Sequence, residues 1–225
     1  MSVENEDQPN ADSANSAKPR PSFSITDARR HAHVAYKKSE FILSRAYGLF
    51  RDTNLEWEQI RAEETTVQNI LIGYVAPLAA IPVVCDLIGS TLFGHLLQFN
   101  PGQALIRAVI TWIMSIALVF FIGVLINAVA DNFEADKNDL GAQKIAAYSL
   151  TPAFLSGFFS LWPPLWWLSL FALAAMVFLM YRGLPILMKT PPERALGYAS
   201  TVTVAAAVAL IIVFALSSCV IGPAS

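Results

Sequence analysis

The stretch ILIGYVAPLAAIPVVCDLIGSTLFGHLL, residues 70–97, decides the fold. It is almost entirely apolar, because Asp86 is its one formally charged residue. A helix of about 28 residues, rising about 1.5 Å per residue, is longer than the roughly 30 Å hydrocarbon thickness of a bilayer. The stretch therefore predicts a membrane span. Pro77 and Pro82 each lack a backbone donor, so we expect a kinked span whose freed carbonyls find partners on neighbouring helices.

The composition of the whole chain is typical of an integral membrane protein. Hydrophobic residues make up 55 % of the chain and charged residues only 14 %, against about 25 % charged residues in soluble domains. The two cysteines, Cys85 and Cys219, both lie in apolar stretches. They are expected to pack as small hydrophobic side chains, and the sequence predicts neither a disulfide framework nor a metal site.

The N-terminal part is polar and divides into two segments. Residues 1–38 have too few large hydrophobic residues to form a core, so we expect a disordered cytosolic tail. Its basic residues near position 30 either attract anionic lipid headgroups or belong to a solvated tail that only sets the topology. Residues 39–69 are expected to form amphipathic helices at the membrane interface. The first of these has an apolar arc formed by Phe41, Ile42, Ala46, Leu49 and Phe50, with Arg45 and Arg51 off its centre.

Four more apolar stretches follow the first, and together they predict an all-α, polytopic membrane domain over residues 70–221. The third stretch is interrupted by Pro152 and Gly157, and the fourth carries Gly183 and Pro185 near its end. The five expected spans are residues 70–97, 104–130, 145–161, 165–187 and 198–221.

Lysine and arginine residues are distributed very unevenly between the two sides of this predicted domain. With a cytosolic N-terminus, the cytosolic segments are 1–69, 131–144 and 182–197, and they hold every Lys and Arg except Arg107. They also hold every carboxylate except Asp86. Because positive loops stay in the cytosol, the sequence predicts a cytosolic N-terminus and an external C-terminus.

Four blocks of the sequence resemble the YIP family, which is named for interaction with Ypt/Rab GTPases, and they look most like its bacterial branch. The resemblance covers about residues 45–200, and it departs at Asn54, where a proline is expected. It implies five spans, a cytosolic N-terminus and a helix kink at Tyr74, Pro77, Leu78 and Pro82. In the eukaryotic family the implied partners are Rab-type GTPases. The blocks are Arg45-Ala46 with EWEQI at 56–60 and Glu63, YVAPLAAIP at 74–82, KIAAYSLTPAFLSGFFSLWPPL at 144–165, and YRGLPILMKTPPERALGY at 181–198.

Two charged residues are candidates for a site within the membrane. Asp86 lies toward the outer half of the first span, and Arg107 begins the second span on the same side. Intramembrane carboxylates are costly and often functional. Three interpretations stay open: a structural charge pair that holds two spans together, a proton- or ion-coupling site, and an outward-facing Asp86 near interfacial water.

The sequence carries no signature of an enzyme. It contains no His-Glu-x-x-His, no Gly-x-Ser-x-Gly and no phosphate-binding loop, so we expect no catalytic residue, no cofactor and no metal. The expected partners are membrane lipids and other membrane proteins or a second copy, and not nucleic acid. The alanines Ala205, Ala206, Ala207 and Ala209 admit either a close helix neighbour from a second copy or close packing within one chain. The candidate partner-facing cytosolic positions are Trp57, Glu63, Pro191 and Pro192.

These observations predict a non-enzymatic, multi-pass protein of the YIP type, located in the inner membrane if bacterial. We expect a role in membrane organisation, trafficking or membrane-protein assembly through the cytosolic face. The alternative is a small transporter or channel that uses the kinked first span and Asp86.

Overall fold

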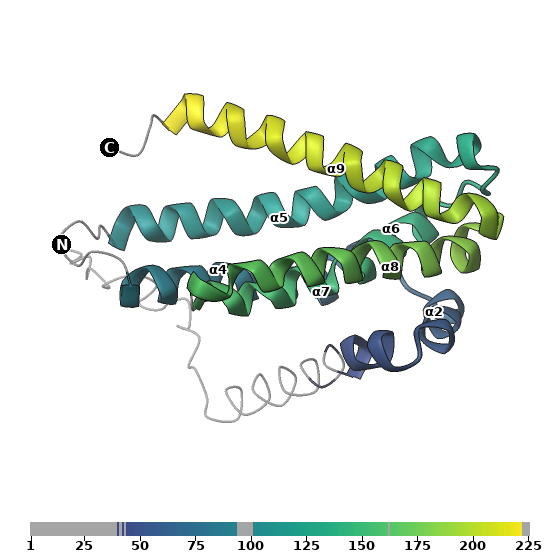
Figure 1. The fold of residues 1–225 in the computed structure, drawn as a ribbon, viewed down its shortest axis with the longest axis horizontal. Coiled ribbons are helices and arrows are strands. Elements are labelled where there is room, and N and C mark those ends of the chain that lie inside the picture. Colours follow the sequence, from purple (N-terminus) through teal and green to yellow (C-terminus); the bar gives the residue numbers. More distant parts are fainter. Residues whose placement is uncertain (1–39, 41, 43, 94–100, 162, 222–225) are drawn as a thin grey trace, which may run out of the picture. The chain divides into compact units, whose positions relative to one another are not determined.

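The computed structural model describes residues 40, 42, 44–93, 101–161 and 163–221. The predicted tail, residues 1–38, and the last part of the first predicted span, residues 94–97, lie outside the described residues. The described chain is helical, and its helices are joined by short turns (Figure 1). A helical segment at 44–51, here called the flanking helix, comes first. It is followed by α2 (Thr53–Ala62), α3 (Val67–Ile70), the π-helix η1 (Leu71–Val75), α4 (Ala76–Phe93), α5 (Pro101–Val129), η2 (Ala130–Phe133), α6 (Asp139–Ser149), α7 (Thr151–Leu155), η3 (Ser156–Leu161), η4 (Pro163–Leu168), α8 (Ser169–Met188) and α9 (Pro192–Ile221).

Three helical stretches are long and apolar enough to cross a bilayer: Val67–Gly89, Ala104–Phe133 and Ser169–Met188. They correspond to the first, second and fourth predicted spans. Most of α5 exposes large apolar side chains, which suits a surface that faces lipid rather than water. The exposed residues of this helix include Leu105, Ile106, Val109, Ile110, Ile113, Met114, Phe120, Phe121 and Val124.

The first of these stretches is irregular where the sequence places its prolines. The π-helix η1 ends two residues before Pro77, and Pro82 lies inside α4. A proline ring clashes with the carbonyl four residues earlier in a regular α-helix, and a wider π turn just before Pro77 is consistent with that constraint. A bend of the helix axis at either proline stays a prediction. The indole Nε1 of Trp112 on α5 donates to the Ala76 carbonyl at 2.8 Å, which joins the second stretch to the first.

The third predicted span, residues 145–161, is interrupted as its proline and glycine indicate. Here α6 ends at Ser149, and α7 carries Pro152 in its first turn before the chain continues as η3. Gly157 of η3 lies so close to α4 that an added Cβ would be 2.4 Å from the Pro82 Cα. The fifth predicted span lies within α9, which begins earlier, at Pro192, where a proline loses no helical hydrogen bond. That residues 145–161 and 198–221 cross the membrane stays a prediction.

Side-chain caps begin the two helices that follow the flanking helix, α2 and α3. Asp52 is the N-cap of α2, and its carboxylate accepts a hydrogen bond from the Leu55 amide. The hydroxyl of the next residue, Thr53, donates to the Leu49 carbonyl at 2.8 Å and joins α2 to the flanking helix. Residues 63–66 are not helical, and Thr66 caps the next helix, α3. The N-terminal helices are therefore separate from the first membrane stretch, which leaves them free to fold back on the bundle.

Candidate functional site

Arg45 of the flanking helix points inward and joins both ends of α2. One guanidinium nitrogen lies 2.7 Å from the Glu56 carboxylate, and the other lies 2.6 Å from the Glu63 carboxylate. The Arg45 side chain is only 10 % exposed. Charge-assisted hydrogen bonds of this length are among the stronger polar contacts in proteins. Arg45 therefore holds the flanking helix and α2 together as one unit.

Lys144 of α6 fastens this unit to the helical bundle. Its ammonium group donates to the backbone carbonyls of Ile60 and Glu63, each at 2.6 Å, and the residue is only 3 % exposed. These carbonyls belong to the last turn of α2, where no further helical amide is available to bond them. Burial lowers the pKa of Lys144, and the Glu63 carboxylate acts in the opposite direction. Lys144 is thus a C-terminal cap supplied from another helix.

The four charged residues Arg45, Glu56, Glu63 and Lys144, here called the junction cluster, balance one another. Two side chains are positive, two are negative, and all four are buried or partly buried. An unpaired charge in such a place is strongly destabilising. The cluster is therefore complete only when the flanking helix, α2 and α6 are all in place.

Aromatic rings continue the junction cluster into the first membrane stretch. Tyr148 lies one turn after Lys144 on α6, and the Arg45 guanidinium lies 5.7 Å from the centroid of the Tyr148 ring. Trp57 meets the same ring edge-on at 6.4 Å, and Tyr74 lies 4.6 Å from it. Four helical segments thus converge on one tyrosine.

A buried chain of hydrogen bonds also links Tyr74 and Tyr148, whose rings are in contact. The Thr151 hydroxyl donates to the Tyr148 carbonyl at 2.7 Å and lies 2.8 Å from the Tyr74 hydroxyl. A threonine hydroxyl has only one proton to donate, so Tyr74 is the donor in the second bond. The chain connects the π-helix η1 with the turn between α6 and α7.

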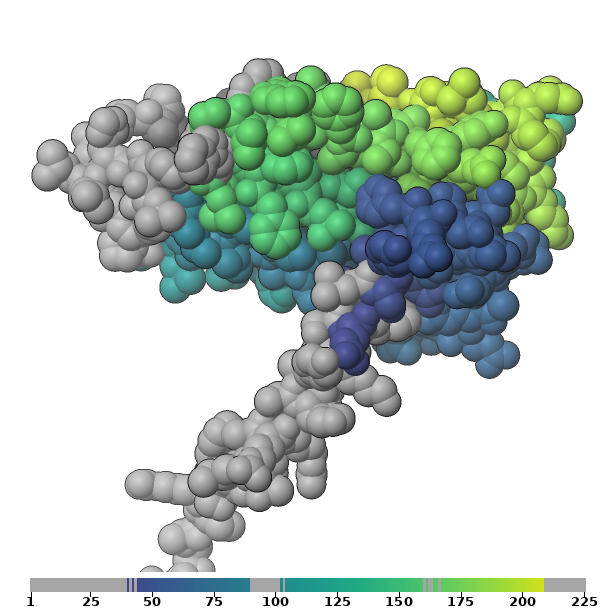
Figure 2. Space-filling view, turned by 60° about the horizontal axis from the view of Figure 1, so that its bottom comes forward, coloured from purple at the N-terminus to yellow at the C-terminus, as the bar shows by residue number. Residues whose placement is uncertain are grey.

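Trp57 of α2 packs against Gly183 of α8. It is fully buried, and a Cβ added to Gly183 of α8 would lie 2.8 Å from the Trp57 ring. Figure 2 shows the N-terminal helices, in dark blue, lying directly against α8, in green.

The four candidate partner-facing positions differ in exposure. Trp57 is buried, Glu63 is half-buried in the junction cluster, Pro191 is half-buried and Pro192 is exposed. A partner at any of them stays a prediction.

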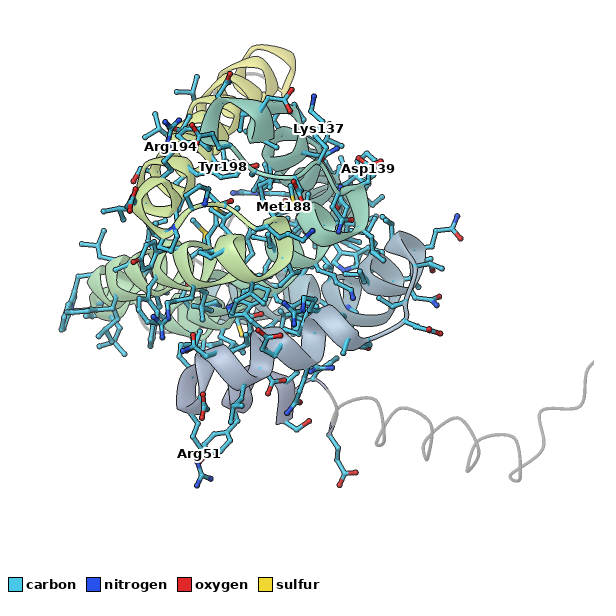
Figure 3. All side chains as sticks on the ribbon, turned by 90° about the vertical axis from the view of Figure 1, so that its right-hand side faces the viewer. Arg51, Lys137, Asp139, Met188, Arg194 and Tyr198 are labelled. Atoms are coloured by element: carbon cyan, nitrogen blue, oxygen red, sulfur yellow. The ribbon has the colours of Figure 1, made fainter. Side chains whose placement is uncertain are left out.

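The connector between η2 and α6 forms a charged rim at the same end of the bundle (Figure 3). The Asp136 amide donates to the Met188 carbonyl at 2.8 Å, at the end of α8. Exposed ion pairs join Arg194 to Glu134, Lys189 to Asp136 and Lys137 to Asp131, at 2.8, 2.9 and 2.6 Å. We call the residues of these three ion pairs the rim. It links the connector to the α8–α9 turn.

Tyr198, in the second turn of α9, joins this helix to α5 and η2. Its hydroxyl donates to the Ile126 carbonyl of α5, and its ring stacks on Phe133 with 4.7 Å between centroids. Both interactions are made by a fully buried side chain. They hold α9 against the end of α5 (Figure 1).

The remaining predicted site residues lie on α4 and α5. Leu78 is buried in the core, and Pro77 and Pro82 are half-buried. Asp86 and Arg107 are both exposed, and none of the ion pairs formed by the described residues joins them. A role for this pair stays a prediction.

Comparison with known proteins gives a family match over most of the chain. The sequence model of the Yip1 domain matches residues 47–214. Two relatives are both named "Inner membrane protein YohC", one from Escherichia coli strain K12 and one from Escherichia coli O6:H1 strain CFT073. Each is 29 % identical to this chain over 189 residues, which is 78 % of this chain and 94 % of the relative. No solved structure matches the chain.

Proposed function

Because the chain belongs to the Yip1-domain family of membrane proteins, we propose that it is a non-enzymatic, five-span protein of a bacterial inner membrane. The relatives named as inner membrane proteins support this location. The distribution of Lys and Arg supports a cytosolic N-terminus and an external C-terminus. An alkaline phosphatase fused after Ser225 should be active, and a green fluorescent protein fused there should be dark. The reverse pattern would contradict this topology.

The proposed activity is the organisation or assembly of other membrane proteins through the cytosolic face. The observation that carries this proposal is the junction cluster, which commits four charged residues to fixing the N-terminal helices on the bundle. Such a cluster rarely adds net stability over an apolar core, and it favours one definite arrangement of the face. The rim adds exposed charges of both signs beside it. A fixed, charged surface suits the recognition of a protein partner.

The test is site-specific photo-crosslinking in native membranes. A photoreactive amino acid at the exposed Pro192 should capture a defined membrane protein. The same group at Ile113, an exposed apolar position on α5, is the matched control and should not capture that protein. Equal capture at both positions, or capture of no protein at Pro192, would argue against a partner on the cytosolic face.

A small transporter or channel is the second candidate function. It is favoured by the π-helix beside Pro77, because π-helices often occur at functional sites, and by the carboxylate of Asp86 on the same apolar stretch. Asp86→Asn separates the two candidates. An ion-dependent growth defect at normal expression, without loss of the crosslinked partner, would favour the transporter, whereas an unchanged phenotype and partner would favour the organising role.

A further inference from the structure

The flanking helix has two different faces, and the bundle covers only one of them. Ala46 and Leu49 are buried, at 6 % and 0 % exposure, and Leu49 belongs to the hydrophobic core. Tyr47 and Phe50 are 63 % and 54 % exposed, and Arg51 is exposed beside them. Positions three and four residues apart share one side of a helix. The outer face therefore carries two aromatic rings and a cation.

The contacts of the N-terminal helices fix their depth relative to the bundle. Trp57 packs on Gly183, which lies five residues before the end of α8 at Met188. At about 1.5 Å per residue, this contact is roughly 7.5 Å inside the end of a helix that is long enough to span the bilayer. Interfacial helices lie about 5–10 Å into the headgroup–acyl boundary. A membrane surface at the end of α8 would therefore place the N-terminal helices at the headgroup–acyl boundary.

Arg182 of α8 lies beside an exposed aromatic ring. Its guanidinium lies 5.9 Å from the ring of Phe178, which is 51 % exposed. Phe178 lies one turn before Arg182, so the long side chain runs back along α8 and covers apolar surface with its methylene groups. Arg182 is the direct neighbour of Gly183, where Trp57 docks.

We propose that the outer face of the flanking helix binds anionic phospholipid, with Arg51 on the phosphate and with Tyr47 and Phe50 at the headgroup–acyl boundary. The Arg51 guanidinium lies 5.9 Å from the Tyr47 ring, and the side chain points away from the bundle (Figure 3). Aromatic rings favour the headgroup–acyl boundary of a bilayer, and a cation at that boundary is attracted by anionic lipid headgroups. The neighbouring helix α8 also exposes large apolar side chains, among them Phe171 and Phe178, so lipid fits this side of the protein better than a soluble protein does.

The experiment uses the full chain in nanodiscs, with a photoreactive amino acid at Phe50 and, in a second variant, at Tyr47. The discs contain either phosphatidylcholine alone or phosphatidylcholine with phosphatidylglycerol, and mass spectrometry measures the lipid adducts. Both positions should yield lipid adducts, enriched in phosphatidylglycerol. The photoreactive group at Lys137, an exposed residue of the rim, is the control and should yield none. Adducts at Lys137 equal to those at Phe50 would overturn the proposed depth.

Charge removal then tests the role of Arg51. Arg51→Gln should lower the phosphatidylglycerol adducts at position 50 about fivefold, the effect of one cation near an anionic surface. It should change nothing in discs of phosphatidylcholine alone. Arg61→Gln is the matched control, because Arg61 is exposed on α2 and pairs with Glu58. Equal losses for both variants, adducts with protein instead of lipid, or no preference between the two lipids would each refute a phosphate site at Arg51.

Discussion

Replacing Lys144 by methionine keeps the length of the side chain and removes its charge, so it tests the junction cluster directly. The change removes two hydrogen bonds to the last turn of α2 and leaves Glu56 and Glu63 with Arg45 alone. Breaking a buried charge arrangement in this way costs about 3–5 kcal/mol. Each 1.4 kcal/mol is a tenfold change in an equilibrium constant. Detachment of α2 should therefore become at least about 100-fold more favourable.

Hydrogen–deuterium exchange in nanodiscs measures this detachment locally. Amides of α2, Thr53–Ala62, should exchange about 100-fold faster in Lys144→Met, whereas amides of α5 should keep their rates, because local opening need not involve the whole bundle. Lys137→Met is the control, since its exposed pair with Asp131 contributes at most about 1 kcal/mol. If α2 exchanges equally in both variants, the reasoning about a buried cap is wrong.

Two further changes test the packing beneath the junction cluster, both by thermal unfolding in detergent. Gly183→Ala places a methyl group 2.8 Å from the Trp57 ring and should lower the free energy of unfolding by about 1–3 kcal/mol. Gly73→Ala is the control: its added Cβ meets no atom of a neighbouring element within 4 Å, so it should raise the free energy of unfolding by up to about 1 kcal/mol. Equal losses in the two variants would contradict the close contact at Gly183. Thr151→Val leaves the Tyr74 hydroxyl without its acceptor and should lower the free energy of unfolding by about 1–3 kcal/mol. When it is combined with Tyr74→Phe, the total loss of stability should be smaller than the sum of the two single losses. Fully additive losses would show that the hydrogen bond is not made.

The membrane stretches could be predicted from sequence because they depend on length and apolar content alone. The first, second and fourth predicted spans agree with the three candidate membrane helices. The interruption near Pro152 was also predictable, since proline cannot continue a helical hydrogen-bond ladder. The π-helix before Pro77 was not predictable in this form, because a proline permits several distortions and the packing around it selects one.

The junction cluster was less accessible to sequence reasoning, because its members lie far apart along the chain. The residues Arg45, Glu56, Trp57 and Glu63 appeared as one block of the family resemblance, but a block does not say which side chains face inward. Lys144 was counted among the residues of a cytosolic connector. The one available signal was its position four residues before Tyr148, which places both on the same side of a helix that enters an apolar stretch.

The burial of Arg45 and Lys144 bears on how the topology is specified. Both residues contribute to the cytosolic excess of Lys and Arg, yet both are occupied inside the folded protein. The positive-inside rule acts during insertion, before such contacts form, and the remaining cytosolic Lys and Arg still greatly exceed the single Arg107 on the other side. Lys144→Met should therefore loosen α2 without inverting the protein, and the fusions at the C-terminus should give the wild-type signal. An inverted signal would mean that Lys144 directs insertion, and its cap on α2 would then be a secondary role.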